Sequence, residues 1–145
     1  MNLESRKPGE ELGNIELSER IIGAAIRVHK ELGPGFLESI YEEALAVELR
    51  LLRLQFERQK PVPLFYRGQA IGEHRLDLLI ENAFIVELKA VTALEKIHFA
   101  VVRSYLKALG LSDALLLNFA TTRLTIKRVG REYLPLANDE ENISF

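Results

Sequence analysis

The sequence lacks cysteine altogether, and it lacks an excess of either charge. Without cysteine there can be no disulfide, no thiol catalysis and no thiolate metal site, so any metal site must use oxygen or imidazole ligands. Lys and Arg number 19 against 21 Asp and Glu, which gives a net charge of -2. That charge provides no general basic field, so a nucleic-acid site would have to be a local patch.

Long hydrophobic runs are also lacking. Charged residues interrupt every apolar stretch before it could span a bilayer, and residues 1–11 carry charge where a signal peptide needs an apolar segment. We therefore expect a cytoplasmic protein with no membrane contact. The 9 glycines, 5 prolines and 48% hydrophobic residues exclude collagen-like and disordered classes. The sequence has no P-loop, dinucleotide fingerprint, zinc-ligand pair or Ser-His-Asp arrangement.

The residues that are present predict one α/β domain. Apolar residues recur at steps of three and four in three stretches, which is typical of helices with one buried side. These helices are predicted at residues 18–32, 37–54 and 94–108. Gly33-Pro34-Gly35 ends the first helix and Gly110 ends the third, because proline breaks a helix and glycine commonly follows its last turn.

Six strands are predicted around these helices. Pro61 and Pro63 exclude a helix and favour two edge strands between residues 55 and 66. The other strands are predicted at residues 74–80, 83–90, 114–119 and 124–129. The order α-α-β-β-β-β-α-β-β is typical of a mixed sheet flanked by helices, the α/β class. We expect a single domain with its core at about 18–129 and tails at 1–14 and 131–145.

The hairpin between residues 74 and 90 has a predictable register. A two-residue turn at Glu81-Asn82 would place Asp77 opposite Val86, which sets a polar side chain against an apolar one. A three-residue loop at 81–83 instead pairs apolar residues with apolar residues. The predicted pairs are Ile80 with Phe84, Leu78 with Val86, Leu76 with Leu88 and Asp77 with Glu87.

This register places two carboxylates opposite one another, about 5 Å apart at the β-carbons. One interpretation is a solvated patch in which Lys89 and Arg75 offset the acids Asp77 and Glu87. The other is a site for a divalent cation, because Mg²⁺ takes hard oxygen ligands and needs only one or two protein carboxylates. Lys89 could then orient or deprotonate an attacking water and stabilise negative charge on phosphorus.

Two motifs resemble a known family. Asp77, followed on the next strand by Glu87-Leu88-Lys89, resembles the catalytic signature of the PD-(D/E)XK nuclease superfamily. Gly35, Glu38 and Tyr41 resemble the diagnostic segment of the small bacterial GxxExxY proteins. The resemblance extends over residues 21–125, and it implies a mixed central sheet in an α/β sandwich.

The resemblance also implies roles for individual residues. Asp77, Glu87 and Glu38 would hold Mg²⁺, with Mn²⁺ as a substitute, and Lys89 would be the catalytic lysine. Taken alone, Glu38 is better explained as a charge that favours the helix dipole, but the resemblance places it in the site. The implied activity is hydrolysis of phosphodiester bonds in nucleic acid, with DNA as the expected form.

The third predicted helix carries candidates for nucleic-acid binding. Lys96, Arg103 and Lys107 form a basic stripe, which is either a solvated face or a track for phosphates. Arg123, Lys127 and Arg128 could widen it. Tyr105 is either a core residue or a further substrate contact. Val101 stands where the resemblance leads us to expect a glutamine that helps to hold substrate.

Other polar residues are given structural roles. Glu42 is expected to point toward solvent and Glu48 to form a buried ion pair. His29 and His98 are expected to be structural, and His74 has no evident partner.

Two functions therefore remain open. The first is a magnesium-dependent nuclease, which the complete set of acids and the lysine favour. The second is a catalytically idle nuclease-fold domain that binds nucleic acid or a protein partner, which the acidic net charge and Val101 favour.

Overall fold

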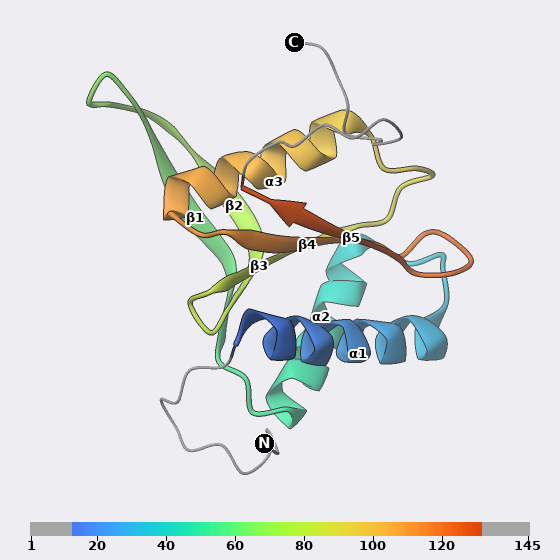
Figure 1. The fold of residues 1–145 in the computed structure, drawn as a ribbon. Coiled ribbons are helices and arrows are strands. Elements are labelled where there is room, and N and C mark those ends of the chain that lie inside the picture. Colours follow the sequence, from blue (N-terminus) through green and yellow to red (C-terminus); the bar gives the residue numbers. More distant parts are fainter. Residues whose placement is uncertain (1–12, 132–145) are drawn as a thin grey trace.

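The computed structural model describes residues 13–131, which form a five-stranded mixed sheet with three helices (Figure 1). The helices are α1 (Asn14–Leu32), α2 (Glu38–Leu51) and α3 (Lys96–Leu109). The strands are β1 (Phe56–Tyr66), β2 (Gln69–Ile80), β3 (Phe84–Lys89), β4 (Asp113–Asn118) and β5 (Thr125–Gly130). The predicted α/β class, with a mixed sheet flanked by helices, is confirmed. No helix within residues 13–131 is long and apolar enough to span a membrane.

The strands follow one another across the sheet in chain order. All neighbours are antiparallel except β3 and β4, which are parallel and are joined through α3. A parallel pair needs such a crossover, because a tight turn cannot return the chain to the same end of the sheet. Helices α1 and α2 pack on one face of the sheet and α3 packs on the other (Figure 1).

Each face of the sheet has its own hydrophobic cluster. The first lies under α1 and α2, and it contains Leu78, Val86 and Leu88 from the sheet. The second lies under α3, and it contains Leu76 and Ile85. Burial of apolar surface on both faces is the main stabilising contribution in such a sandwich, at about 25 cal/mol per Å².

Several predicted boundaries are corrected. Helix α1 begins at Asn14, four residues earlier than expected, and α2 ends at Leu51. The segment with Pro61 and Pro63 forms a single strand of 11 residues, so β1 replaces the two short strands of the prediction. Both prolines lie on the edge strand of the sheet, where a missing N–H is tolerated. The predicted tails fall outside the described residues, apart from positions 13, 14 and 131.

The predicted hairpin register is confirmed as far as the ladder extends. The pairs are Leu78 with Val86, Leu79 with Ile85 and Ile80 with Phe84, joined through a loop at 81–83. Glu81 and Asn82 both have φ 54, a left-handed conformation that reverses the chain tightly. The ladder ends at Leu78 and Val86, directly before the two acids.

The sheet is irregular at that point. Gln59 on β1 has φ 50, and the pairing of β1 with β2 omits Gln59 and Asp77. Leu76 lies in the cluster under α3, whereas Leu78 lies in the cluster under α1 and α2. Residues two apart on a regular strand share a face, so the alternation is broken between them. The predicted pairing of Leu76 with Leu88 is therefore wrong.

Candidate functional site

Beyond Leu78 and Val86, side-chain hydrogen bonds of Asp77 and Glu87 connect β2 and β3 in place of backbone hydrogen bonds. The Asp77 backbone N–H donates to Glu87 Oε1 at 3.0 Å, and the Leu88 backbone N–H donates to Asp77 Oδ2 at 2.8 Å. Each carboxylate thus accepts a hydrogen bond from the opposite strand. These contacts hold the two acids together and fix their orientation between the strands.

The surroundings of both acids favour their neutral forms. Burial is the main cause that raises the pKa of Asp77, and the hydrogen bonds from Leu88 and Gln59 oppose it. Burial, followed by the charge of Asp77, raises the pKa of Glu87 to about 8. Glu87 is only 5% exposed. A buried pair of like charges is relieved by a proton or by a cation between them.

Lys89 follows Glu87 on β3 with one residue between them. Its side chain is half-buried, and its positive charge lowers the pKa of both Asp77 and Glu87, although less than burial raises them. Lys89 forms no salt bridge within residues 13–131. The ammonium group is therefore close enough to act on the acids electrostatically without being neutralised by direct contact.

Glu38 is the first residue of α2 and reaches the same end of β3. Its Oε2 accepts a hydrogen bond from the Ala90 backbone N–H at 3.1 Å. Its negative charge also contributes to the raised pKa of Glu87. The structure thus brings Glu38 to the end of the strand that carries Glu87 and Lys89.

The loop before α2 explains how Glu38 is positioned. Gly35 has φ +114, a conformation that L side chains rarely adopt. The hydroxyl of Tyr41 donates to the Gly33 carbonyl at 2.6 Å and accepts from the Phe36 backbone N–H at 3.2 Å. The ring of Tyr41 stacks on Phe119 at 4.5 Å between centroids. Tyr41 therefore fixes both the loop and the start of α2.

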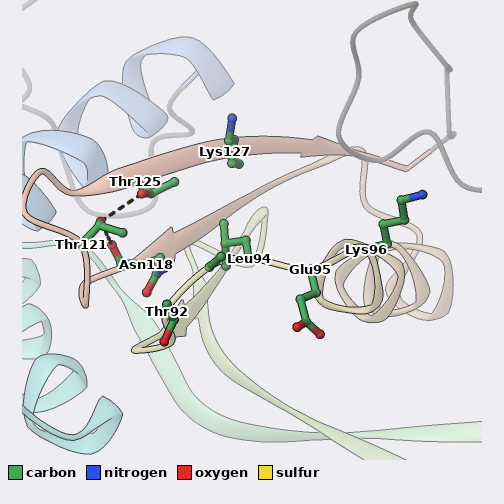
Figure 2. A pocket seen from close by; sticks show the side chains of 9 residues that line it. Thr92, Leu94, Glu95, Lys96, Asn118, Thr121, Thr125 and Lys127 are labelled. Carbon is green, nitrogen blue, oxygen red and sulfur yellow. Dashed lines mark hydrogen bonds between the residues drawn. The ribbon is translucent and has the colours of Figure 1, made fainter.

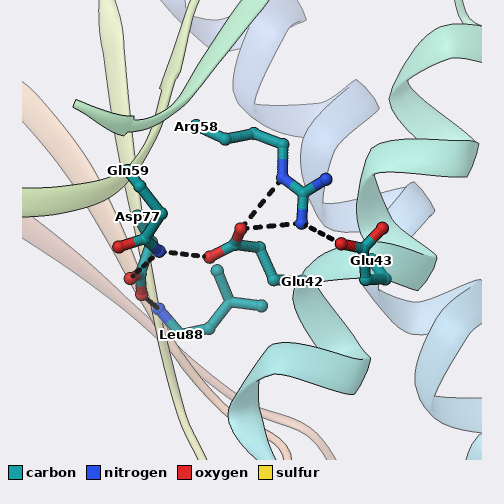
Figure 3. Close-up of polar contacts among 6 residues, drawn as sticks. All are labelled: Glu42, Glu43, Arg58, Gln59, Asp77 and Leu88. Atoms are coloured by element: carbon teal, nitrogen blue, oxygen red, sulfur yellow. Dashed lines mark hydrogen bonds and ion pairs between the residues drawn. The ribbon is translucent and has the colours of Figure 1, made fainter.

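Glu42 belongs to the network around Asp77, which the sequence analysis missed (Figure 3). The Gln59 amide donates to Glu42 Oε1 at 2.6 Å and to Asp77 Oδ1 at 3.1 Å, so that Nε2 lies between the two acids. Arg58 Nε donates to Glu42 at 2.9 Å, and the same guanidinium contacts Glu43. Glu42 is 7% exposed. The prediction that it points toward solvent is wrong, because β1 covers it.

The residues of α3 do not form the exposed stripe that was predicted. Arg103 is 6% exposed, whereas Lys96 and Lys107 on either side are exposed. Tyr105 is 5% exposed and packs against His74. Burial and the negative charges of Glu87 and Asp77 raise the pKa of Tyr105. Its side chain thus reaches the acid pair from the second hydrophobic cluster.

Val101, four residues before Tyr105, is half-buried beside the same cluster under α3.

The histidines have structural partners. His29 Nε2 contacts the Thr121 carbonyl oxygen at 2.9 Å, and His98 forms a capping box with Glu95 at the start of α3. His74, for which the sequence suggested no partner, lies 3.1 Å from Ser104 Oγ.

Glu48 forms the predicted ion pair, with Arg27 at 3.0 Å. The pair is not buried, because the Arg27 side chain is 65% exposed.

The acids suit a divalent cation by their chemistry. Asp77 and Glu87 supply hard oxygen ligands, and Mg²⁺ commonly uses one or two protein carboxylates with waters and phosphate oxygens. The mutual repulsion that raises the pKa of Glu87 is the energy that a cation would relieve. Within residues 13–131, no three His, Asp or Glu side chains are grouped closely enough to form a complete metal site. The match to a divalent cation therefore depends on Asp77 and Glu87 alone.

Comparison with known proteins identifies the family. No curated protein and no solved structure matches the chain. A profile of the PD-(D/E)XK nuclease superfamily matches residues 15–129, which include all the helices and strands that surround the acid pair except the outermost residues of α1 and β5. The chain belongs to the PD-(D/E)XK nuclease superfamily.

Proposed function

We propose that this protein is a magnesium-dependent nuclease that hydrolyses phosphodiester bonds in nucleic acid, with DNA as the expected substrate. One observation carries the proposal: Asp77 and Glu87 are held together by reciprocal hydrogen bonds to the opposite strand, with the charge of Lys89 acting on both. Membership of the nuclease superfamily supports the same activity.

Each residue of the proposed site has a distinct task. Asp77 and Glu87 would hold the cation, and Glu38 would contribute a carboxylate from the start of α2. A divalent ion held there would supply a positive charge for the phosphoryl oxygens and would lower the pKa of water. Lys89 Nζ is proposed to orient the attacking water by hydrogen bonding and to stabilise the negative charge that develops on phosphate.

Glu42 and Gln59 are proposed as positioning residues. The Gln59 amide contacts Asp77 Oδ1, while the Leu88 backbone N–H contacts Asp77 Oδ2. Both oxygens of Asp77 are therefore oriented before any ligand binds. Glu42, held by Arg58, fixes the amide in turn. Such preorganisation reduces the cost of aligning a ligand during the reaction.

We also propose that the chain is one of the GxxExxY proteins within the superfamily. The positions concerned are Gly35, Glu38 and Tyr41. Their contacts supply a physical reason for the motif: a glycine with positive φ, an acid that reaches β3, and a tyrosine that secures the loop between them.

The proposal is tested with purified protein and end-labelled DNA or RNA in Mg²⁺, Mn²⁺ or EDTA. We expect cleavage only with the divalent ion. Asp77→Asn, Glu87→Gln and Lys89→Ala should each lower kcat by at least about a hundredfold, because each removes a charge next to the reacting phosphate. Glu73→Gln is the matched control, since Glu73 is a half-exposed acid on the same strand as Asp77.

Two results would contradict the mechanism. Full activity in Asp77→Asn or Lys89→Ala would remove these residues from the reaction. Wild-type protein that binds Mg²⁺ but cleaves no DNA or RNA would favour the catalytically idle binding domain.

A further inference from the structure

A cavity of about 610 Å³ with a mixed polar and apolar lining lies at the end of β4 (Figure 2), and neither Asp77 nor Glu87 lines it. The segment from Thr92 to Lys96, which enters α3, forms one wall. The other wall comes from the end of β4 and from β5, through Asn118, Thr125 and Lys127. It lies where the parallel strands β3 and β4 end, which is the usual place for a ligand in α/β sheets.

The cavity lies close to the candidate catalytic residues along the chain and across the sheet. Asn118, which lines the cavity, pairs with Lys89 in the sheet, and neighbouring strands lie about 4.8 Å apart. Thr92, on the other wall, follows Lys89 by three residues, so their Cα atoms are at most about 11 Å apart. That upper limit corresponds to about three base steps of 3.4 Å along a nucleic-acid strand, so the cavity lies within about three base steps of Lys89.

The end of the cavity nearest to Lys89 is rigid. Asn118 is 1% exposed, and its side chain bonds the backbone of Val91 on both sides, accepting from N–H at 3.1 Å and donating to C=O at 2.9 Å. It also accepts from the Ala120 backbone N–H at 3.2 Å. These bonds join the segment after β3 to the segment after β4, and so keep the spacing between the acid pair and the cavity fixed.

Two lysines and a hydroxyl of the lining are groups that can bind phosphate, while Ala93 and Leu94 make part of the lining apolar. Lys96 and Lys127 supply positive charge from two different elements, and their side chains project outward from the rim (Figure 2). The hydroxyl of Thr92 has no hydrogen-bond partner among residues 13–131. Hydroxyl and lysine donors are the groups that proteins use to contact the nucleic-acid backbone.

The lining contains one acid, Glu95, and its side chain caps the start of α3. Its side chain accepts a hydrogen bond from the backbone at the third position of α3, as one half of the capping box with His98. Its negative charge is therefore directed at the start of the helix, where the helix dipole favours it. The residues that line the cavity thus include two lysines and one acid, in a protein that is acidic overall.

We infer that this cavity is a backbone-binding subsite, in which Lys96 and Lys127 hold the phosphates of a nucleic-acid strand next to the one at the acid pair. The inference rests on the proposed nuclease function. An extended polyanion fits better than a small ligand, because the side chains of Lys96 and Lys127 project outward from the rim and do not converge inside the cavity (Figure 2). The subsite keeps Lys96 from the predicted track and Lys127, which was expected to widen it, but it does not continue along α3, because Arg103 is buried.

The test measures binding separately from cleavage. Fluorescein-labelled duplex DNA and single-stranded DNA are titrated in EDTA with wild-type protein and with Lys96→Gln, Lys127→Gln and the double variant, at several salt concentrations. We expect the double variant to bind at least about tenfold more weakly at low salt. The slope of log affinity against log salt should fall by about 1.8 for duplex or about 1.4 for a single strand, because two phosphate contacts are lost.

Two further variants make the test specific. Lys96→Arg with Lys127→Arg keeps both charges and should restore the salt slope, which a merely structural role would not require. Lys107→Gln, at the other end of α3, separates the subsite from the helical stripe. Thermal unfolding followed by circular dichroism checks that each variant folds.

The outcomes distinguish this inference from the proposed function. An unchanged salt slope in the double variant, or an equal loss in Lys107→Gln, would overturn the subsite even if the protein cleaves DNA normally. Wild-type protein that binds neither DNA form would overturn it as well. Weaker binding in the double variant supports the subsite even if wild-type protein shows no cleavage, and in an active protein the same variant should raise KM more than it lowers kcat.

Discussion

Glu87 accepts a hydrogen bond from the backbone of Asp77 at 3.0 Å, at the point where the ladder between their strands stops. The acids therefore have a structural role as well as the proposed chemical one. An uncharged amide of the same shape keeps the acceptor oxygen for the opposite strand in each position, whereas alanine removes it. This difference allows the two roles to be measured separately.

The first prediction concerns the stability of metal-free protein against pH. The pKa of Glu87 rises from its ordinary value of 4.5 to about 8 on folding, so the folded state keeps a proton that the unfolded state has released. The contribution of this proton to the free energy of unfolding is fully present below pH 4.5. It falls by about 1.4 kcal/mol per pH unit above that and is lost as the pH rises through 8. The raised pKa of Asp77 acts in the same direction.

Thermal unfolding in EDTA between pH 5 and pH 8 checks this. The Tm of wild-type protein should fall as the pH rises, and Glu87→Gln should flatten the slope because it has no proton to lose. An equally steep slope in Glu87→Gln would assign the effect to other groups.

The second prediction separates charge from hydrogen bonding at Asp77. Asp77→Ala leaves the Leu88 backbone N–H without its partner, which costs about 1–3 kcal/mol. Asp77→Asn keeps the acceptor for Leu88, although it removes the charge and replaces the oxygen that accepts from Gln59 by an NH2 group, so it should lose less stability in EDTA than Asp77→Ala. Urea unfolding gives both values, and equal losses in the two variants would show that the hydrogen bond is unimportant.

The third prediction concerns the network on β1. Glu42→Ala should destabilise the protein by about 1–3 kcal/mol and lower activity, since it removes an acceptor from both Arg58 and Gln59 in a buried place. Glu43→Ala is the control, because Glu43 contacts the same arginine from an exposed position. We expect a clearly smaller loss in urea unfolding for that variant. Similar losses of stability in the two variants would mean that the ion pair with Arg58 accounts for the effect, and that the buried contact of Glu42 with Gln59 contributes little.

The fourth prediction concerns the loop before α2. Tyr41→Phe removes one hydroxyl that makes two hydrogen bonds and should cost about 1–2 kcal/mol. Because these bonds secure the start of α2, activity should fall along with stability, although the ring does not take part in the chemistry. Tyr66→Phe, at a residue that is 64% exposed, is the control for loss of a tyrosine hydroxyl. Unchanged stability in Tyr41→Phe would show that the two hydrogen bonds of the hydroxyl do not secure the loop before α2.

The hairpin that carries the acids was predictable because its information is local. Alternation of apolar residues on both sides of a three-residue loop excludes the other register, and the pairs from Leu78 to Phe84 confirm it. The same reasoning failed at Leu76, because Gln59 on the neighbouring strand adopts a left-handed conformation. Gly, Asn and Asp commonly signal that conformation in a sequence, and glutamine does not.

Burial of charged side chains was the less predictable part. The helical spacing of Glu42 places it toward solvent, and only the tertiary position of Arg58 on β1 covers it. Arg103 likewise belongs to a regular basic spacing on α3, yet it is buried. Periodicity describes one element at a time, whereas these side chains depend on which other element packs against them. The cavity beside Asn118 could not be inferred for the same reason.

The parallel pairing of β3 and β4 has a consequence for folding. Asp77 and Glu87 are ten residues apart in the chain, so the hairpin that joins them closes a short loop. The contact between Lys89 and Asn118 forms only after the whole of α3 has been placed between their strands, and longer loops close at a greater cost in entropy. The acid pair should therefore assemble early and the neighbouring cavity late. During folding, the Asp77 and Glu87 pair should therefore form before the surface proposed to align a nucleic-acid strand with it, whereas Glu38, 52 residues from Ala90, joins through a longer loop.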